Sequence, residues 1–129
     1  MEIHLSDINN NCLPPEDVRI RELSAVPWSD GRRVSVYLEL DPSQRHPNAD
    51  LQIKDNNGQI IAATSIIEII ERKVELTMHL PSEQTGGRYQ LCVTLFFAEI
   101  PEDPESDQDQ ELVKITIVDD RQIWFEISA

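Results

Sequence analysis

The 129-residue sequence has little glycine, few basic residues and no long apolar run, and each shortage excludes a class of protein. Glycine occurs only four times, and the sequence contains neither the glycine-rich fingerprint of dinucleotide-binding proteins nor a phosphate-binding P-loop. No apolar run approaches the roughly 20 residues of a membrane-spanning helix. Residues 1–7 lack the basic and apolar regions of a secretory signal. If Met1 is the natural start, we therefore expect a cytoplasmic protein.

Basic residues are outnumbered: 11 Lys and Arg stand against 24 Asp and Glu, which gives the chain a net charge of −13. Nucleic acids and anionic membranes are bound by clustered Lys and Arg, whereas here the basic residues occur singly or in pairs such as Arg32-Arg33. We expect neither kind of partner. The acidity by itself indicates only a well-solvated surface.

Cysteine and histidine are also scarce. Two cysteines, Cys12 and Cys92, are too few for a disulfide scaffold, and the sequence leaves open whether they pair with each other. Three lone histidines and two distant cysteines do not supply the close ligand pairs of a zinc site. A chain of this length forms one domain that buries enough surface to fold without a metal or cofactor, and we predict neither.

The sequence does contain a repeated alternation of apolar and polar residues, which is typical of half-buried strands. Residues 33–40, 73–80, 88–97 and 111–118 all show this alternation. Short strands separated by turns predict an all-β, antiparallel sandwich. The predicted core consists of Val34, Val36, Leu38, Leu51, Ile53, Val74, Leu76, Met78, Tyr89, Leu91, Val93, Leu95, Val113, Ile115 and Ile117.

Turn residues separate the predicted strands. Asn57-Gly58 lies between two apolar runs and is typical of a tight hairpin. Residues 65–72 are rich in isoleucine and also fit a helical stripe, but β-branched side chains favour a strand that ends in a turn. Residues 123–127 form a further strand or continue the preceding one past a bulge.

We divide the chain into an arm and a domain. Residues 1–17 are polar and are predicted to be an N-terminal arm or edge strand. Residues 18–129 are predicted to be a single β-sandwich domain with an acidic loop at 99–111, which contains seven acidic residues and no basic one. Calcium takes such oxygen ligands, but this loop lacks the glycine turn of an EF-hand. We predict no metal site, and the sequence leaves open whether this loop binds calcium.

The segment 87–93, with the sequence GRYQLCV, resembles the start of strand F in immunoglobulin-like and fibronectin-type sandwiches. The resemblance spans residues 18–118 and implies seven to nine strands and a tyrosine corner at Tyr89. The sequence departs from antibody-like domains, because Cys12 precedes the first predicted strand and Trp28 follows it. A resemblance of fold implies no function.

A reactive site is hard to assemble from these residues. Cys92 would need a histidine beside it to act as a nucleophile. Alternation places Cys92 and His79 on the outward faces of successive strands, which lie in different sheets of such a sandwich, so we expect no dyad. Because no other catalytic set can be named, we do not expect an enzyme.

The outward face of residues 88–97 holds the candidate binding residues Cys92, Thr94 and Phe96. Thr116 and Val118 are expected to extend this face if their strand pairs alongside. The alternative is that the N-terminal arm covers the face.

The arm would bring Ile3, Leu5 or Leu13 to that face.

Trp124 is the fourth candidate binding residue, because it alternates with Phe125 and one of the two must point away from the core.

We predict a non-enzymatic protein-interaction module that presents a sheet face or edge to another protein or to a second copy. One alternative is a carbohydrate-binding sandwich that uses the exposed aromatic residues Trp28, Tyr37 and Trp124. A second alternative is a small hydrolase of unknown substrate.

Overall fold

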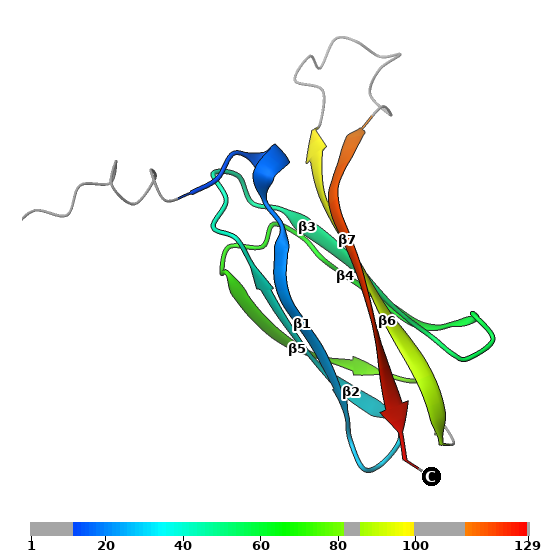
Figure 1. Ribbon diagram of the computed structural model, residues 1–129. Coiled ribbons are helices and arrows are strands. Elements are labelled where there is room, and N and C mark those ends of the chain that lie inside the picture. Colours follow the sequence, from blue (N-terminus) through cyan, green and yellow to red (C-terminus); the bar gives the residue numbers. More distant parts are fainter. Residues whose placement is uncertain (1–11, 82–85, 100–112, 129) are drawn as a thin grey trace, which may run out of the picture.

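The computed structural model describes residues 12–81, 86–99 and 113–128 (Figure 1). In chain order the elements are η1 (Pro15–Asp17), β1 (Ile20–Pro27), β2 (Arg33–Leu40), β3 (Asn48–Lys54), β4 (Ile60–Ile66), β5 (Lys73–His79), β6 (Gly87–Glu99) and β7 (Lys114–Ile127).

The strands form two antiparallel sheets, with strand orders β1-β2-β5 and β4-β3-β6-β7. This arrangement confirms the predicted all-β, antiparallel sandwich. Among the described residues no helix is long and apolar enough to cross a membrane.

The core lies between the two sheets and is built from the inward side of the predicted alternation. Along β2 every second residue is buried, as expected for a strand with one face on the core and the other exposed to solvent. Val74 and Leu76 are half-buried and pack against the core. The predicted core residues that are buried are Val34, Val36, Leu38, Leu51, Ile53, Met78, Tyr89, Leu91, Val93 and Leu95.

Three predicted core residues are wrong: Val113, Ile115 and Ile117 are 45%, 59% and 63% exposed. Val113 precedes β7, and for Ile115 and Ile117 the reason is a β-bulge in that strand. Asp119 lies opposite Leu95, but Ile117 lies opposite Phe96, so β7 has one extra residue at this point. Because an extra residue reverses which side chains face the core, the isoleucines beyond the bulge point outward.

The same bulge contradicts the expected extension of the outward face. Thr116 lies opposite Phe97, whose side chain is buried, and Val118 is half-buried against the core. Both therefore lie on the inward side. The bulge also explains how β7 continues through residues 123–127, which was one of the two alternatives for that run.

The isoleucine-rich segment 65–72 is only partly a strand. Strand β4 ends at Ile66, and the following loop is held by two backbone donors: Glu68 N–H donates to Asn48 Oδ1 over 2.8 Å, and Ile69 N–H donates to the Pro47 carbonyl over 2.7 Å. These bonds fix Ile69 in the core, where it is 5% exposed. The strand prediction is therefore wrong beyond Ile66.

The predicted hairpin at Asn57-Gly58 is confirmed, and it joins β3 to β4. Gly58 has a φ of +83°, which a residue without a Cβ adopts at little cost. One carboxylate oxygen of Asp55 accepts hydrogen bonds from the backbone N–H groups of Asn57 and Gln59, each 2.9 Å long. The turn is thus fixed by its own residues.

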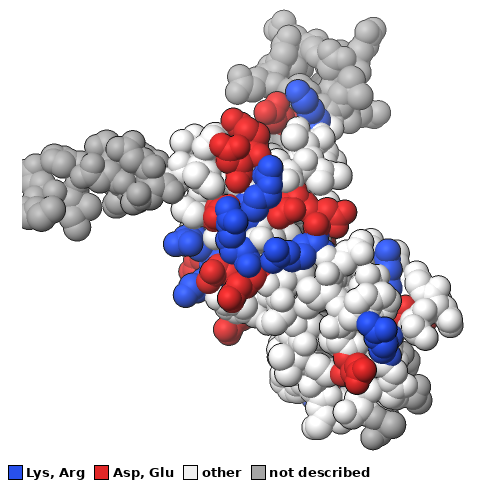
Figure 2. Space-filling model, viewed as in Figure 1, with Lys and Arg blue, Asp and Glu red and all other residues white. Residues whose placement is uncertain are grey.

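Strands β1 and β7 belong to different sheets but meet along one side of the sandwich (Figure 1). Ile20 N–H donates to Asp119 Oδ2 over 2.8 Å, and Arg121 donates to the Arg21 carbonyl over 3.3 Å. In the view of Figure 2, basic side chains gather near the middle of the molecule, and acidic side chains lie around them.

The N-terminal arm is described only from Cys12 onward. Leu13 forms a bridge with Ser43 and packs against the core, so it does not cover the outward face of β6. Ile3 and Leu5 lie outside the described residues, as does most of the acidic loop predicted at 99–111.

Candidate functional site

The four predicted binding residues share the outward face of the four-stranded sheet. Cys92, Thr94 and Phe96 occupy alternate positions of β6, and Trp124 of β7 lies opposite Gln90, which belongs to the same face. The structure therefore brings all four to one side of the sheet, but in different surroundings.

Cys92 is covered on this face, with 8% of its surface exposed. Its cross-strand neighbours are Gln52 on β3 and Gln122 on β7. Burial raises the pKa of the Cys92 thiol, a shift that Lys54 opposes and Asp120 reinforces. A raised pKa leaves less thiolate at neutral pH, so the group is a poor nucleophile.

No disulfide joins Cys12 to Cys92. The predicted separation of Cys92 from His79 is confirmed, because His79 ends β5 in the other sheet. The Cys–His dyad that the sequence disfavoured is thus not formed by these two residues.

Phe96 belongs to an apolar surface that the sequence predicted only in part. It lies opposite Ile117, and Ala98 lies opposite Ile115, in the two cross-strand pairs beyond the bulge. We call these four residues the outer patch. Ile115 and Ile117 were missed because their alternation fits either face, and only the register with β6 decides between them.

Beyond Phe96 the same face becomes mainly polar. Asn48 of β3 lies on the other side of Phe96, and a shallow hollow there is lined by the apolar residues Ile67, 66% exposed, and Ala98 together with Gln44, Arg45, His46, Asn48 and Glu68. Exposed apolar residues that are contiguous, rather than scattered singly, are typical of interaction surfaces.

On the opposite side of the sheet, the end of β6 is covered. Phe97 is 3% exposed, and the Arg45 guanidinium lies 5.5 Å from its ring centroid. Arg45 also pairs with Glu99 over 3.3 Å. At this end of the ribbon the inward face is therefore covered on β6, whereas Thr116 of β7 is exposed on that side.

Trp124 does not join the outer patch. Its partner Gln90 lies six residues from Phe96 along β6, which is about 20 Å at roughly 3.4 Å per residue. The intervening pairs, Thr94 with Asp120 and Cys92 with Gln122, are mainly polar. The indole is 50% exposed, and the Arg88 guanidinium lies 4.7 Å from the centroid of its ring.

The outward face of the three-stranded sheet has a different character. It has an open hollow of about 420 Å³ lined by Ser24, Ser35, Tyr37, Glu75 and Thr77 among others. Desolvation raises the pKa of Tyr37, and a hydrogen bond from its hydroxyl to Glu39 and the charges of neighbouring carboxylates raise it further.

Trp28 lies near this face at the end of β1. Its indole N–H donates to Ser35 Oγ over 2.8 Å, and the Arg33 guanidinium lies 4.2 Å from the ring centroid. The face therefore combines hydroxyl groups, a carboxylate and aromatic rings.

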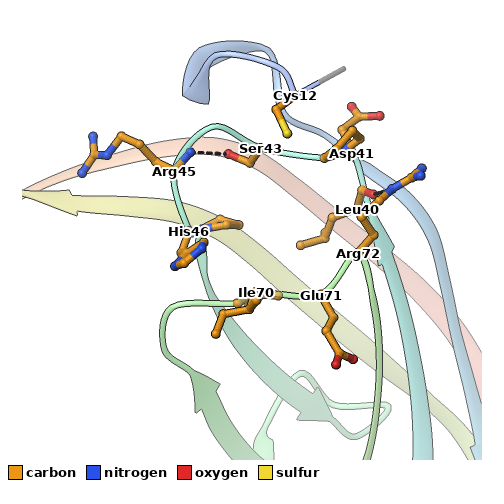
Figure 3. Close-up of a pocket in the computed structure, with 12 residues that line it drawn as sticks. Cys12, Leu40, Asp41, Ser43, Arg45, His46, Ile70, Glu71 and Arg72 are labelled. Carbon is orange, nitrogen blue, oxygen red and sulfur yellow. Dashed lines mark hydrogen bonds between the residues drawn. The ribbon is translucent and has the colours of Figure 1, made fainter. Parts of the chain in front are cut away.

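A smaller pocket of about 100 Å³ lies between Cys12, the loop after β2 and the loop before β5 (Figure 3). Cys12 and His46 stand on different sides of it, and their side chains do not point toward each other in Figure 3. The pocket is well below the roughly 300 Å³ at which small-molecule sites begin.

Among the described residues no group of three or more His, Cys, Asp or Glu side chains is arranged to hold a metal ion. Asp119, which follows the predicted acidic loop in sequence, uses its carboxylate to accept hydrogen bonds from the backbone N–H groups of Ile20 and Asp120.

No protein-family model matches the sequence, and no curated protein matches it. Similar structures are found among larger proteins. A β-glucuronidase of Bifidobacterium dentium has a TM-score of 0.53 at 15% identity, over 86% of this chain and 18% of that one. A glycosyl hydrolase family 2 member from Bacteroides cellulosilyticus has a TM-score of 0.54 at 13% identity, over 85% of this chain and 15% of that one.

This chain thus spans less than a fifth of the length of those proteins. At such low identity the likeness shows a shared fold. It is the fold of one part of each larger protein.

Proposed function

We propose that this chain is a non-catalytic protein-binding module and that its contact surface is the outer patch. The observation that carries the proposal is the bulge in β7, which turns Ile115 and Ile117 to the open side of the sheet, next to Phe96. Bulges commonly re-aim side chains beside functional sites. Burial of such side chains against a partner is the main favourable term in protein association.

The groups that would carry chemistry support a binding role over a catalytic one. Burial raises the pKa of the Cys92 thiol, and His79 lies in the other sheet. The larger hollow is open to solvent on a sheet face, and the smaller pocket does not pair Cys12 with His46.

We also infer that the sandwich is of the immunoglobulin-like or fibronectin type, as the resemblance at 87–93 implied. Three strands packing on four, and a hairpin that joins β3 to β4 within one sheet, support this relationship. Tyr89, at the start of β6, is buried with its ring 5.9 Å from that of Phe125.

The test is affinity capture from the native cell with three forms of the full chain: wild type, Ile117→Lys and Ile60→Lys. Ile60 is the matched control, because it is also an exposed isoleucine, at 50%, on the opposite edge strand of the same sheet. We expect proteins that are retained by wild type and Ile60→Lys but lost with Ile117→Lys. An identical set of captured proteins with all three forms would refute the proposal.

A second candidate is carbohydrate binding, favoured by the hollow on the three-stranded sheet. Hydroxyl groups of Ser24, Ser35 and Thr77, the Glu75 carboxylate and the Tyr37 ring supply hydrogen-bonding and stacking partners of the kind that sugars use. The proteins with similar folds include a β-glucuronidase, which supports this candidate only weakly.

A glycan panel read with wild type and Tyr37→Ala distinguishes the two candidates. Binding that disappears with Tyr37→Ala but survives Ile117→Lys supports the carbohydrate candidate. A panel without any binding glycan eliminates it and leaves the protein-binding proposal untouched.

A further inference from the structure

The outward face of the three-stranded sheet carries an aromatic ring that ends among carboxylates. Tyr37 lies on the central strand β2, directly opposite Ser24 on β1 and Glu75 on β5. The cross-strand pair of Glu22 and Glu39 comes next along the strands on the same face. The Tyr37 hydroxyl donates a 3.0 Å hydrogen bond to Glu39 Oε1, which holds that end of the ring beside the carboxylates. We call Glu22, Tyr37, Glu39 and Glu75 the tyrosine surface.

One lysine faces the three carboxylates of the tyrosine surface. Lys73 lies opposite Glu39, with 3.8 Å between Lys73 Nζ and Glu39 Oε1. Desolvation raises the pKa of Tyr37, and the hydrogen bond and the charges of all three carboxylates raise it further. Three acidic groups against one basic group leave this surface negative, as is the whole chain with its net charge of −13. Such a surface attracts a cation.

At the other end of the same face the charges are already paired. Arg33 forms an ion pair with Asp30 over 2.8 Å, and its guanidinium lies 4.2 Å from the centroid of the Trp28 ring. His79 lies opposite Arg33. Here one guanidinium contacts an aromatic ring and a carboxylate at the same time.

The same combination occurs a second time in the chain. The Arg45 guanidinium lies 5.5 Å from the centroid of the Phe97 ring, and it pairs with Glu99 over 3.3 Å. Among the described residues guanidinium groups lie over three aromatic rings, and the Tyr37 ring is not one of them. The tyrosine surface therefore has the ring and the carboxylates of this arrangement without its cation.

The hollow beside Tyr37 provides room for the missing group. Its volume is about 420 Å³, and it is open along the sheet face. Sites for free small molecules usually enclose most of the ligand. An open hollow is better suited to one side chain of a protein segment that lies across the face.

We propose that the tyrosine surface docks a segment of a partner protein that bears an arginine, with its guanidinium on the Tyr37 ring and paired with Glu75. Arginine fits better than lysine, because a planar guanidinium stacks on a ring and forms two parallel bonds to a carboxylate. The three carboxylates also favour a cation over an uncharged sugar. This second surface lies on the sheet opposite the outer patch, so it goes beyond the proposed function and does not depend on it.

Fluorescence anisotropy of the full chain with a labelled peptide of glycine, serine and two arginines tests the proposal. The comparison peptide has lysines in place of the arginines. Salt at about 0.1 M, with a Debye length of roughly 10 Å, screens attraction to distant charges. We expect the arginine peptide to bind more tightly than the lysine peptide.

Three variants locate the binding. Glu75→Gln and Tyr37→Leu should each raise the dissociation constant of the arginine peptide about threefold or more, which is the contribution of a cation–ring or ion-pair contact at an exposed site. Glu126→Gln is the matched control, because it removes the same charge from an exposed position on the other sheet, and it should leave the dissociation constant unchanged. Glu75 is exposed, so its variant keeps the test independent of any effect of Tyr37→Leu on folding. Amide NMR shifts caused by the peptide should fall on β2 and β5.

Equal weakening by Glu75→Gln and Glu126→Gln would reveal attraction to the net charge alone and would overturn the proposal. Lysine and arginine peptides that bind alike, or an arginine peptide that does not bind, would overturn it as well. A glycan that binds at Tyr37 where the arginine peptide does not would overturn it in favour of the carbohydrate candidate. The outer patch is tested separately through Ile117, so the two proposals can fail independently.

Discussion

Among small changes to single side chains, we expect removal of the Asp119 carboxylate to lower the stability of the fold most. Its Oδ2 accepts a 2.8 Å hydrogen bond from the backbone N–H of Ile20, and its Oδ1 accepts one of 2.9 Å from Asp120 N–H. Ile20 is 2% exposed and begins β1, so this bond ties the three-stranded sheet to the four-stranded one.

Replacing Asp119 with alanine leaves the Ile20 N–H without its acceptor in a place that water reaches poorly. An orphaned buried donor costs about 1–3 kcal/mol, and hydrogen bonds to ionised groups lie toward the upper end of that range. We therefore expect Asp119→Ala to lower the free energy of unfolding by about 2–3 kcal/mol. Each kcal/mol corresponds to a drop of roughly 3–5 °C in Tm for a domain of this size.

Urea denaturation followed by tryptophan fluorescence measures this loss. Asp119→Asn keeps an oxygen acceptor without the charge, so it should cost less than Asp119→Ala, and Asp120→Ala, an exposed neighbour, should stay within about 0.5 kcal/mol of wild type. An Asp119→Ala variant as stable as Asp120→Ala would refute the reasoning that this carboxylate joins the sheets.

Three further predictions concern single residues. A hydrogen bond from Arg21 lowers the pKa of Asp41, so this carboxylate stabilises the fold fully above its unfolded pKa of about 3.9 and less as the pH falls toward the lower folded pKa. The difference in the free energy of unfolding between wild type and Asp41→Asn, measured by urea denaturation, should therefore shrink below about pH 4. A difference that does not change with pH would contradict this. Because burial raises the pKa of Cys92, a Cys12→Ser variant should react with a thiol reagent at pH 8 at least tenfold more slowly when folded than in denaturant, and equal rates would contradict the burial. Gly58→Ala should lower the free energy of unfolding by about 1 kcal/mol, measured by urea denaturation. The cause is backbone strain alone, because the φ of +83° disfavours a residue with a Cβ, and no atom lies within 4 Å of where that Cβ would be. An unchanged midpoint would contradict this.

The strands and the hairpin could be predicted from the sequence because both depend on neighbouring residues. Alternation along residues 33–40 or 88–97 has the period of a strand whatever lies opposite. Asn57-Gly58 forms its turn with help from Asp55, two residues earlier. For these elements the sequence already contains the physical cause.

The segment 65–72 shows where local preference is insufficient. Its isoleucines favour a strand, yet the chain leaves the sheet after Ile66 because Asn48 and Pro47, some twenty residues away, hold Glu68 and Ile69 in a loop. Such a distant contact has no signature in the segment itself.

The candidate binding surface was determined partly by the sequence and partly by the tertiary structure. The sequence alone determined that Cys92, Thr94 and Phe96 share a face, because a strand has a period of two. Only the tertiary structure decided what surrounds them. Cys92 is buried between two cross-strand glutamines, polar pairs separate Trp124 from Phe96, and one extra residue in β7 moves Ile115 and Ile117 from the predicted core to the open side. A run that alternates evenly fits either face equally well, so its orientation is fixed only by the register with the neighbouring strand.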